Sequence, residues 1–263
     1  MLHAFSRTEK VIGKAAMEKL AASKVAVFGI GGVGTFAVEG LIRAGLGKIV
    51  LVDDDCICLT NINRQIHATR KTIGKPKVEA MRDRILEINP EVEVTTYQKF
   101  YLPETENELI QPDYDYIIDA IDTVSGKIGL VMKAREMGIP IISSMGTGNK
   151  LDPTRLEISD ISKTSVCPLA RVMRKELRDR GITSLKVLYS REEPIKPEET
   201  ENTREDTVRH QVPGSVSFVP SAAGLIIAGE VVKDLIREEL GIRMNRDTTS
   251  RSLNHMERRK SDV

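Results

Sequence analysis

A glycine-rich loop of the kind that binds phosphate groups occupies residues 29–34, with the sequence GIGGVG. Gly29 permits a tight turn, and Gly31 and Gly32 have no Cβ atom, so the backbone can approach a phosphate there. Gly34 allows the helix after the loop to pack closely on the strand before it, and the helix N-terminus offers free N–H groups to an anion. Asp53 ends the next strand, where a carboxylate can accept hydrogen bonds from ribose hydroxyls. The loop predicts nucleotide binding, although this pattern alone does not choose between NAD and ATP.

A second set of polar residues favours ATP. Arg64 and Lys77 are cations that can neutralise charge developing on a pentavalent phosphorus. Asp122 follows a later strand, at the carboxyl edge where ligands bind in parallel sheets, and it can hold Mg²⁺. A dinucleotide dehydrogenase does not need this combination, whereas an enzyme acting at the α-phosphate of ATP does. The sequence therefore predicts a site for ATP and Mg²⁺.

The elements that position these residues alternate along the first half of the chain. Apolar runs rich in Val and Ile predict strands at 24–30, 48–53, 93–97, 114–120 and 139–143. Helical spacing of apolar residues predicts helices at 33–44, 76–88 and 124–137. This alternation predicts an α/β fold with a mostly parallel, Rossmann-like sheet covered by helices on both faces.

The second half is less regular. It predicts a strand at 155–160, a helix at 169–180, a charged mobile loop at 190–210 and a helix from 221 to 240. We expect a single domain over 1–240, with a nucleotide-binding core at 23–148 and a substrate and dimer part at 149–240 that includes a mobile loop near 190–212. Residues 241–263 read as a polar, disordered tail.

Composition excludes several classes of protein. The 263 residues include 39 basic and 38 acidic side chains, which argues against a globally basic nucleic-acid protein and against DNA as a partner. Three cysteines cannot build a disulfide framework or a four-cysteine zinc site, so we expect no zinc. We expect neither a secretory signal nor a membrane-spanning helix, and a reducing cytoplasm is the default compartment.

The site residues resemble the ubiquitin-activating E1-like superfamily, whose bacterial members adenylate carboxylates in sulfur-carrier proteins. The resemblance rests on residues 29–34, Asp53, residues 61–65, Lys77 and Asp122, in the order and spacing of that family. It implies that Asp53 binds ribose and Asp122 holds Mg²⁺. It also implies phosphate contacts from Asn61, Arg64 and Lys77. The nucleotide contacts expected from the motif and the resemblance are Gly29, Gly31, Gly32, Gly34, Asp53, Asp55, Asn61, Asn63, Arg64, Lys77, Asp122 and Thr123.

Members of this superfamily also take an arginine from the N-terminal helix of a partner subunit. Arg7 is the candidate for that catalytic role here. The resemblance thus implies a homodimer in which Arg64, Lys77 and Asp122 act in one subunit and Arg7 comes from the other.

Longer stretches are similar to one branch, the tRNA threonylcarbamoyladenosine dehydratases. They are 61–68 (NINRQIHA), 119–123 (DAIDT), 146–153 (GTGNKLDP), 158–169 (ISDISKTSVCPL) and 218–235 (FVPSAAGLIIAGEVVKDL). The resemblance spans about 2–240. It implies ATP-dependent cyclisation of the threonylcarbamoyl side chain of adenosine 37, in the anticodon loop of tRNA, with release of AMP and diphosphate. The resemblance is also compatible with a sulfur-transfer partner such as a cysteine desulfurase or a sulfur acceptor.

The chemistry of such a substrate defines what the protein must do. A carboxylate is a poor electrophile at neutral pH, so attack on the α-phosphate would first convert it to an acyl-adenylate. A carbamoyl atom of the same side chain then attacks the activated carbonyl, and AMP leaves. Because ring closure is intramolecular, positioning and charge stabilisation suffice, and no covalent nucleophile is required.

Further cations are candidates for contacts with RNA. The predicted helix at 169–180 carries Arg171, Arg174, Lys175 and Arg178, which either follow tRNA phosphates or form a solvated face. Lys127 either reaches the pocket or is a surface lysine. Tyr189 and Phe218 are candidates for stacking on a base, although most aromatic residues serve a core.

The remaining motifs are weaker. Cys56 and Cys58 have the wrong spacing for zinc or redox chemistry, and Cys167 is the one candidate for a covalent thiol. His67 and His210 are expected to be structural or exposed. The apolar stretch 221–235 is short and contains charges, so we favour burial in a dimer interface or on the sheet over peripheral membrane association.

Three functions other than tRNA modification are compatible with a nucleotide-binding loop. An activator of a ubiquitin-like sulfur carrier would usually bring C-x-x-C pairs, which are absent. A non-catalytic nucleotide-binding scaffold predicts loss of Arg64, Lys77 or Asp122, and all three are present. A dehydrogenase is the weakest interpretation, because no recognisable hydride-transfer acid or base occurs.

Overall fold

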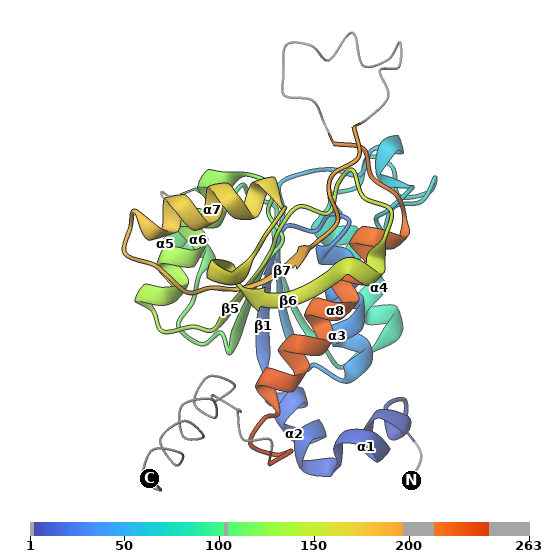
Figure 1. Cartoon of the computed structure of the whole chain (residues 1–263). Helices are drawn as coiled ribbons and strands as arrows, with labels where there is room; N and C mark the ends of the chain where they lie inside the picture. Colours follow the sequence, from blue (N-terminus) through green and yellow to red (C-terminus); the bar gives the residue numbers. More distant parts are fainter. Residues whose placement is uncertain (1–2, 103–104, 197–212, 242–263) are drawn as a thin grey trace, which may run out of the picture.

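The computed structural model describes residues 3–102, 105–196 and 213–241. A seven-stranded sheet forms the centre of these residues, in the order β3-β2-β1-β4-β5-β7-β6 (Figure 1). The strands are β1 (Lys24–Phe28), β2 (Lys48–Val52), β3 (Glu93–Tyr97), β4 (Tyr116–Asp119), β5 (Ile141–Ser144), β6 (Leu156–Asp160) and β7 (Lys186–Ser190). All neighbouring strands are parallel except β6, which pairs antiparallel with β7. The predicted α/β fold with a mostly parallel sheet is confirmed.

Helices cover both faces of this sheet, as the continuous apolar strands require. One face packs against α3 (Gly34–Ala44), α4 (Lys77–Ile88) and α8 (Phe218–Leu235). The other face packs against α6 (Val124–Glu136) and α7 (Pro168–Arg178), with the single turn α5 (Glu106–Leu109) beside them. Two further helices, α1 (Ser6–Ile12) and α2 (Lys14–Ala22), precede β1 and lie beyond the amino ends of the strands (Figure 1).

The predicted strands and helices agree with the structure within a few residues, apart from the differences that follow. The sequence pattern did not predict α1, α2, α5 or β7. The predicted helix 221–240 runs from Phe218 to Leu235, with Pro220 in its first turn, where a missing N–H costs nothing. The predicted mobile loop begins inside β7, and its residues 197–212 lie outside the described residues, as do 242–263 of the predicted tail.

The apolar helix α8 is accounted for by packing inside the chain. Val219, Ala223, Ile227 and Val231 are fully buried in the main core cluster, together with residues of α3 and the sheet. Burial against the rest of the fold, one of the two predicted alternatives, is thus confirmed for this face of α8. In the described residues, no helix combines the length and the apolar character needed to cross a membrane.

The contact between α3 and α8 is close because small residues meet there. A Cβ on Gly224 would overlap the carbonyl oxygen of Val33 and lie 2.7 Å from the Cβ of Phe36 and 2.8 Å from the backbone nitrogen of Ala37. Since these atoms belong to the beginning of α3, α8 supports the helix that follows the glycine-rich loop. The opposite face of α8 is less constrained, because no atom lies within 4 Å of a Cβ built on Gly229.

We predict that Gly224→Ala lowers the free energy of unfolding by about 2 kcal/mol, because backbone atoms of α3 must move to admit the methyl group. Gly229→Ala is the matched control on the same helix, and it should raise stability by about 0.5–1 kcal/mol through helix propensity. Chemical denaturation of both variants measures the difference. Equal effects of the two substitutions would contradict the close contact.

Candidate nucleotide-binding site

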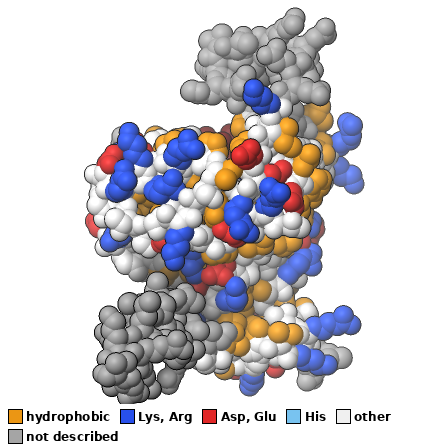
Figure 2. Space-filling view, in the orientation of Figure 1, with side chains coloured by type: hydrophobic (Ala, Val, Ile, Leu, Met, Phe, Trp, Pro, Cys, Tyr) orange, Lys and Arg blue, Asp and Glu red, His pale blue; other side chains and the backbone are white. Residues whose placement is uncertain are grey.

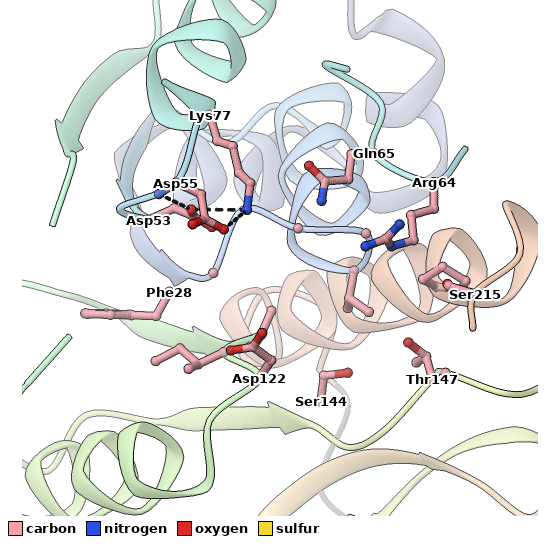
Figure 3. Close-up of a pocket in the computed structure, with 18 of the residues that line it drawn as sticks. Phe28, Asp53, Asp55, Arg64, Gln65, Lys77, Asp122, Ser144, Thr147 and Ser215 are labelled. Carbon is pink, nitrogen blue, oxygen red and sulfur yellow. Dashed lines mark hydrogen bonds and ion pairs between the residues drawn. The ribbon is translucent and has the colours of Figure 1, made fainter. Parts of the chain in front are cut away.

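A cavity of about 430 Å³ opens at the carboxyl ends of β1, β2, β4 and β5 (Figure 3). Parallel strands end together at this edge, so loops distant in sequence meet there. The predicted site residues that line it are Gly29, Gly31, Gly32, Asp53, Asp55, Asn61, Arg64, Lys77 and Asp122. Among the other predicted contacts, Gly34, Asn63 and Thr123 do not line the cavity.

The glycines of the loop meet different requirements. Gly29 has a φ of +90°, and a Cβ there would lie 2.5 Å from the carbonyl oxygen of Ala120. A Cβ on Gly34 would overlap the carbonyl oxygen of Gly29, so Gly34 permits the predicted close packing. Gly31 differs, because the nearest atom to a Cβ there is the Nε2 of Gln65, at 3.9 Å. Neither packing nor backbone conformation requires glycine at position 31, and its bare backbone faces the cavity.

Asp53 is fixed in place by the loop that it follows. Its Oδ2 accepts a hydrogen bond from the backbone N–H of Ile30 at 2.7 Å, and its Oδ1 accepts one from Asp55 at 3.0 Å. The first of these bonds joins the end of β2 to the glycine-rich loop after β1. Asp53 is positioned for the predicted ribose contact, which stays a prediction.

Lys77 begins α4 and is buried between two carboxylates. Its Nζ lies 2.6 Å from Oδ2 of Asp55 and 3.3 Å from Oδ1 of Asp53 (Figure 3). Burial acts to lower the pKa of Lys77, but the two carboxylates outweigh it and hold the pKa above its ordinary value. The side chain is therefore a fixed ammonium at the wall of the cavity. Asp55 pairs with this ammonium, which is a role that the sequence did not suggest.

Arg64 lies across the cavity from Lys77, beside the loop that leads into α8 (Figure 3). Its guanidinium donates to the carbonyl oxygen of Thr60 at 3.0 Å and to Oδ1 of Asn63 at 2.9 Å. The Nδ2 of Asn63 donates to the carbonyl oxygen of Ser215 at 2.9 Å. Asn63 thus orients Arg64 from outside the cavity, which corrects its expected place among the lining residues.

Asn61 is buried at the end of the 3₁₀ turn η1 (Leu59–Asn61). Its Oδ1 accepts the N–H of Cys58 at 3.0 Å, so it also shapes the loop that carries Arg64. The neighbouring Gln65 was not among the predicted contacts, although it lies in the same motif. It is 5% exposed, it lines the cavity, and its Oε1 has no hydrogen-bond partner in the described part of the chain.

Asp122 is exposed at the rim of the cavity, in the turn between β4 and α6 (Figure 3). In the described residues its carboxylate forms no ion pair. The turn is held by Asp119, whose Oδ1 accepts the N–H of Ile121 at 3.1 Å. Thr123 is the residue before α6, and its buried hydroxyl has no partner in the described residues. Thr123 does not line the cavity, and its contact with the nucleotide stays a prediction.

Both predicted alternatives for Lys127 are wrong. Its side chain is 0% exposed and does not line the cavity, so it is neither a surface lysine nor a pocket residue, and it is not available to RNA. Its Nζ lies 3.0 Å from Oδ2 of Asp119, and the Oγ of Ser143 donates to the same carboxylate oxygen at 2.5 Å. The Asp119–Lys127 pair is buried directly behind the carboxyl ends of β4 and β5, and it fixes those ends relative to each other.

The basic helix α7 is partly accounted for by contacts inside the chain. Arg174 is half-buried, and its guanidinium donates to the carbonyl oxygen of Thr164 at 2.8 Å, which corrects its expected availability to RNA. Arg171, Lys175 and Arg178 are exposed. The predicted stacking by Tyr189 is also corrected, because its ring is 2% exposed in a core cluster.

Two other candidates lie away from the cavity. Arg7 is exposed on α1, beyond the amino ends of the strands, whereas the cavity lies at their carboxyl ends (Figure 1). The structure therefore does not bring Arg7 to the cavity of its own chain. Cys167 is buried and does not line the cavity, and Cys56 and Cys58 are exposed.

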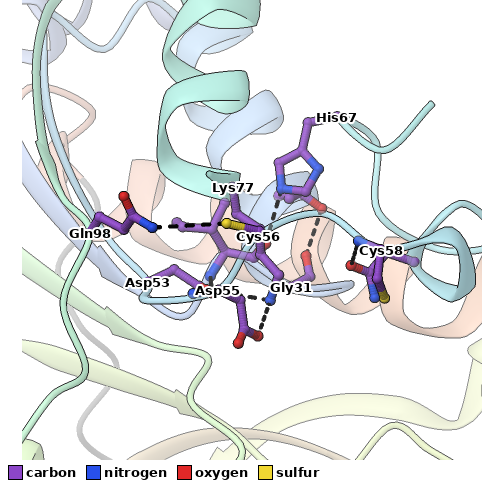
Figure 4. Close-up of polar contacts among 11 residues, drawn as sticks. Gly31, Asp53, Asp55, Cys56, Cys58, His67, Lys77 and Gln98 are labelled. Carbon is purple, nitrogen blue, oxygen red and sulfur yellow. Dashed lines mark hydrogen bonds and ion pairs between the residues drawn. The ribbon is translucent and has the colours of Figure 1, made fainter. Parts of the chain in front are cut away.

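His67 supports the glycine-rich loop, as Figure 4 shows beside Lys77 and the two carboxylates. Its Nε2 lies 3.2 Å from the carbonyl oxygen of Ile30, and the ring is almost completely buried. Burial lowers the pKa of His67 from 6.5 to about 4, and the carbonyl of Ile30 opposes this only in part. The ring is neutral near pH 7 and structural, as the sequence analysis expected.

Fold and cavity together place the chain in the Rossmann-like class of α/β proteins, with a ligand site at the carboxyl edge of the sheet. The sequence matches the ThiF family over residues 5–262. It is 48% identical to the tRNA threonylcarbamoyladenosine dehydratase of Bacillus subtilis over 252 residues, which cover 90% of this chain and 96% of that protein. The corresponding protein of Escherichia coli is 41% identical over 68% of this chain and 67% of its own length.

A crystal structure of the Escherichia coli dehydratase TcdA in complex with ATP superimposes with a TM-score of 0.81 at 32% identity, covering 91% of this chain and 96% of that one. Another crystal structure holds the same protein with AMP. This chain belongs to the ThiF family and, within it, to the tRNA threonylcarbamoyladenosine dehydratases.

We predict that the neutral state of His67 makes stability depend on pH. The pKa of this histidine is 6.5 in the unfolded chain and about 4 in the folded chain. The unfolded state therefore binds more protons between these values, so the contribution is present above pH 6.5 and is lost as the pH falls. At pH 5 the loss is about 2 kcal/mol.

Unfolding free energies at pH 7 and pH 5 test this prediction. His67→Gln should lose less stability over this interval than the unsubstituted protein. The prediction is wrong if His67→Gln and the unsubstituted protein lose the same free energy of unfolding between pH 7 and pH 5.

Proposed function

We propose that this chain uses ATP to dehydrate the threonylcarbamoyl side chain of adenosine 37 in tRNA, forming a cyclic product, AMP and diphosphate. The observation that carries the proposal is that one cavity joins the bare backbone of Gly31, the cations Arg64 and Lys77, and the carboxylate of Asp122, which has no ion pair in the described part of the chain. This set suits transfer to an α-phosphate and offers nothing for hydride transfer. Its occurrence in a chain 48% identical to a dehydratase over nearly all of both proteins supports the particular substrate.

The nucleotide is oriented along the edge of the sheet. Asp53 at the end of β2 accepts from ribose hydroxyls, and the loop at residues 29–34 receives the phosphates on its N–H groups. Arg64 and Lys77 stand on opposite sides of the phosphates and stabilise the charge that develops there. Since Arg64 is already oriented by Asn63, and Lys77 by Asp53 and Asp55, little reorganisation is needed during reaction.

Asp122 fits the role of magnesium ligand. Mg²⁺ binds proteins through one or two carboxylates and completes its shell with phosphate oxygens and water, and Asp122 is a rim carboxylate without an ion pair in the described residues. When bound, Mg²⁺ would neutralise phosphate charge. The carboxylates of Asp53 and Asp55 fit this role less well, because Lys77 already pairs with both.

The reaction then needs two bond exchanges. A carboxylate oxygen of the substrate bonds to the α-phosphorus, and diphosphate leaves with the electrons of the broken P–O bond. The carbamoyl oxygen next bonds to the activated carbonyl carbon, AMP leaves, and the carbamoyl nitrogen gives up a proton to solvent. Overall, the side chain loses the elements of water. Because the second exchange is intramolecular, holding the side chain folded is the main contribution of the protein.

The exposed cations of α7 support tRNA binding. Figure 2 shows Lys and Arg side chains gathered over α7, where Arg171, Lys175 and Arg178 are exposed. Leu169, in the first turn of this helix, lines the cavity. A phosphate backbone that lies along α7 can therefore present a nearby nucleoside to the cavity. Arg174 is excluded from this surface by its bonds to Thr164.

A homodimer completes the proposal. The exposed position of Arg7 beyond the opposite edge of the sheet suits an arginine that acts in the cavity of a second copy. Exposed apolar side chains at Leu59, Phe218 and Leu225 provide surface for that association. A sulfur-transfer partner stays a prediction.

The experiment that tests the function is turnover with Mg-ATP and tRNA bearing threonylcarbamoyladenosine, following AMP and the mass of the modified nucleoside. We expect AMP together with loss of one water from the nucleoside. Asp122→Asn should lower kcat by about 10²-fold or more if this carboxylate serves the phosphates. AMP formation only with a carrier protein that ends in Gly-Gly would instead make the chain a carrier activator.

Gly31→Ala tests the phosphate cradle separately from the fold. Its Cβ meets no protein atom closer than 3.9 Å, so stability should be unchanged within about 0.5 kcal/mol. The methyl group would occupy the place of a phosphate, so affinity for ATP should fall at least about tenfold. Calorimetric titration with ATP measures this, and unchanged affinity would remove the loop from the nucleotide site.

A further inference from the structure

The cavity continues beyond the residues assigned to the nucleotide. Its far side is formed by Ser144, the last residue of β5, by residues 145–148 after it, and by Leu169 and Ser215, and we call this part the β5 arm. In the strand order, Asp53 follows β2, the glycine-rich loop follows β1, Asp122 follows β4, and the arm follows β5. Each step along a sheet is about 4.8 Å, so the arm lies roughly 14 Å from the end of β2.

This order separates the two reactants. The ribose and the phosphates extend from β2 toward β1 and β4, across the point where the strand order reverses. The arm is on the other side of the phosphates and opens toward α7, as the lining residue Leu169 shows. A group that attacks the α-phosphorus can therefore reach it through the arm.

Ser144 directs a buried hydroxyl into the arm. Successive side chains of a strand point to opposite sides, and Ser143 is turned toward the buried pair of Asp119 and Lys127. Ser144 is consequently turned the other way, is only 4% exposed and lines the cavity. Its hydroxyl donates to the carbonyl oxygen of Met145 at 3.2 Å, which leaves its lone pairs available.

Thr147 adds a second hydroxyl to the same space. In Figure 3, Ser144 and Thr147 lie around the opening that Arg64 and Asp122 also face. No hydrogen bond involves the hydroxyl of Thr147 in the described part of the chain. Hydroxyls both donate and accept, so this pair suits a ligand that carries carbonyl oxygens and N–H groups together.

Gly146 leaves open space in the arm, although the packing of the fold does not require a glycine there. A Cβ there would meet only the Cβ of Leu169, at 3.9 Å, and its φ is outside the left-handed region. Gly148 differs, because its Cβ would lie 2.7 Å from the Cβ of Pro213. Packing therefore requires glycine at 148 but not at 146, where the missing side chain only leaves space in the cavity.

We propose that the β5 arm binds the threonylcarbamoyl group of the substrate. Ser144 and Thr147 hydrogen-bond its carbamoyl oxygen and nitrogen, and the open face of Gly146 admits its carbon chain. The carboxylate then points toward Arg64 and the α-phosphorus, and the carbamoyl oxygen is held close to the carbonyl that it attacks after activation. This inference rests on the proposed function and assigns the acyl subsite within the same cavity.

Gly146→Ala is the steric test. The variant should keep its melting temperature, because the nearest protein atom to the new methyl group is the Cβ of Leu169, at 3.9 Å. Its affinity for ATP should stay within about twofold, because the proposed arm lies outside the proposed nucleotide contacts. Its kcat/KM for the modified tRNA should fall at least about tenfold. The matched control is Gly229→Ala, whose Cβ is also unopposed but lies outside the cavity, and which should retain activity.

Ser144→Ala and Thr147→Val test the hydroxyls, with the exposed Thr95→Val on β3 as control. Each removes one hydrogen bond to the substrate, so kcat/KM should fall roughly three- to tenfold. Poorer positioning also lets water intercept the acyl-adenylate, so AMP released per cyclic product should rise above one. Loss of stability alone would not change this ratio.

The outcomes separate the two proposals. If the unsubstituted protein does not convert the modified tRNA, the proposed function fails. If it does, and Gly146→Ala, Ser144→Ala and Thr147→Val all retain its kcat/KM and its AMP-to-product ratio, the acyl subsite is overturned. It is equally overturned if Gly146→Ala weakens ATP binding as much as it lowers kcat/KM, because the arm would then belong to the nucleotide.

Discussion

The site depends on one close backbone contact, between the turn after β1 and the end of β4. Gly29 lies so near the carbonyl of Ala120 that no side chain fits between them, and Gly34 lies even closer to the carbonyl of Gly29. This contact brings the start of α3 close to the strand ends, where Gly29, Gly31 and Gly32 line the cavity. The hydrogen bond from Ile30 to Asp53 then fixes this carboxylate to the same loop. A shift of the turn would move each of these groups together.

Around this contact, buried charges set the shape of the cavity. Lys77 is held by Asp53 and Asp55, and Lys127 is held by Asp119 with Ser143 beside it. Ion pairs of this kind contribute little net stability, because desolvation offsets their attraction, but removal of one partner leaves an uncompensated charge. Their effect here is to fix strand ends and side chains in one arrangement. The first group joins the end of β2 to the start of α4, and the second joins the ends of β4 and β5.

The division of the cavity follows from the strand order. The residues proposed for the nucleotide come from β2, β1 and β4 and the loops after them, whereas the proposed acyl subsite comes from β5 and its contact with α7. The ends of β4 and β5 are joined by the Asp119–Lys127 pair, so the two proposed subsites have a common rigid support. An enzyme that acts mainly by positioning requires such a support.

The sequence by itself determined the elements whose signal is local. Apolar runs predicted the parallel strands, and glycine spacing predicted the phosphate-binding loop. The order of the motifs predicted that Asp53, Arg64, Lys77 and Asp122 belong to one site. It did not reveal β7, because five residues become a strand here through pairing with distant β5 and β6. Nor did it reveal that Lys127 is buried, that Asn63 acts through Arg64, or that Ser144 and Gly146 line the cavity. Those properties depend on which segments meet in space, and only tertiary packing decides that.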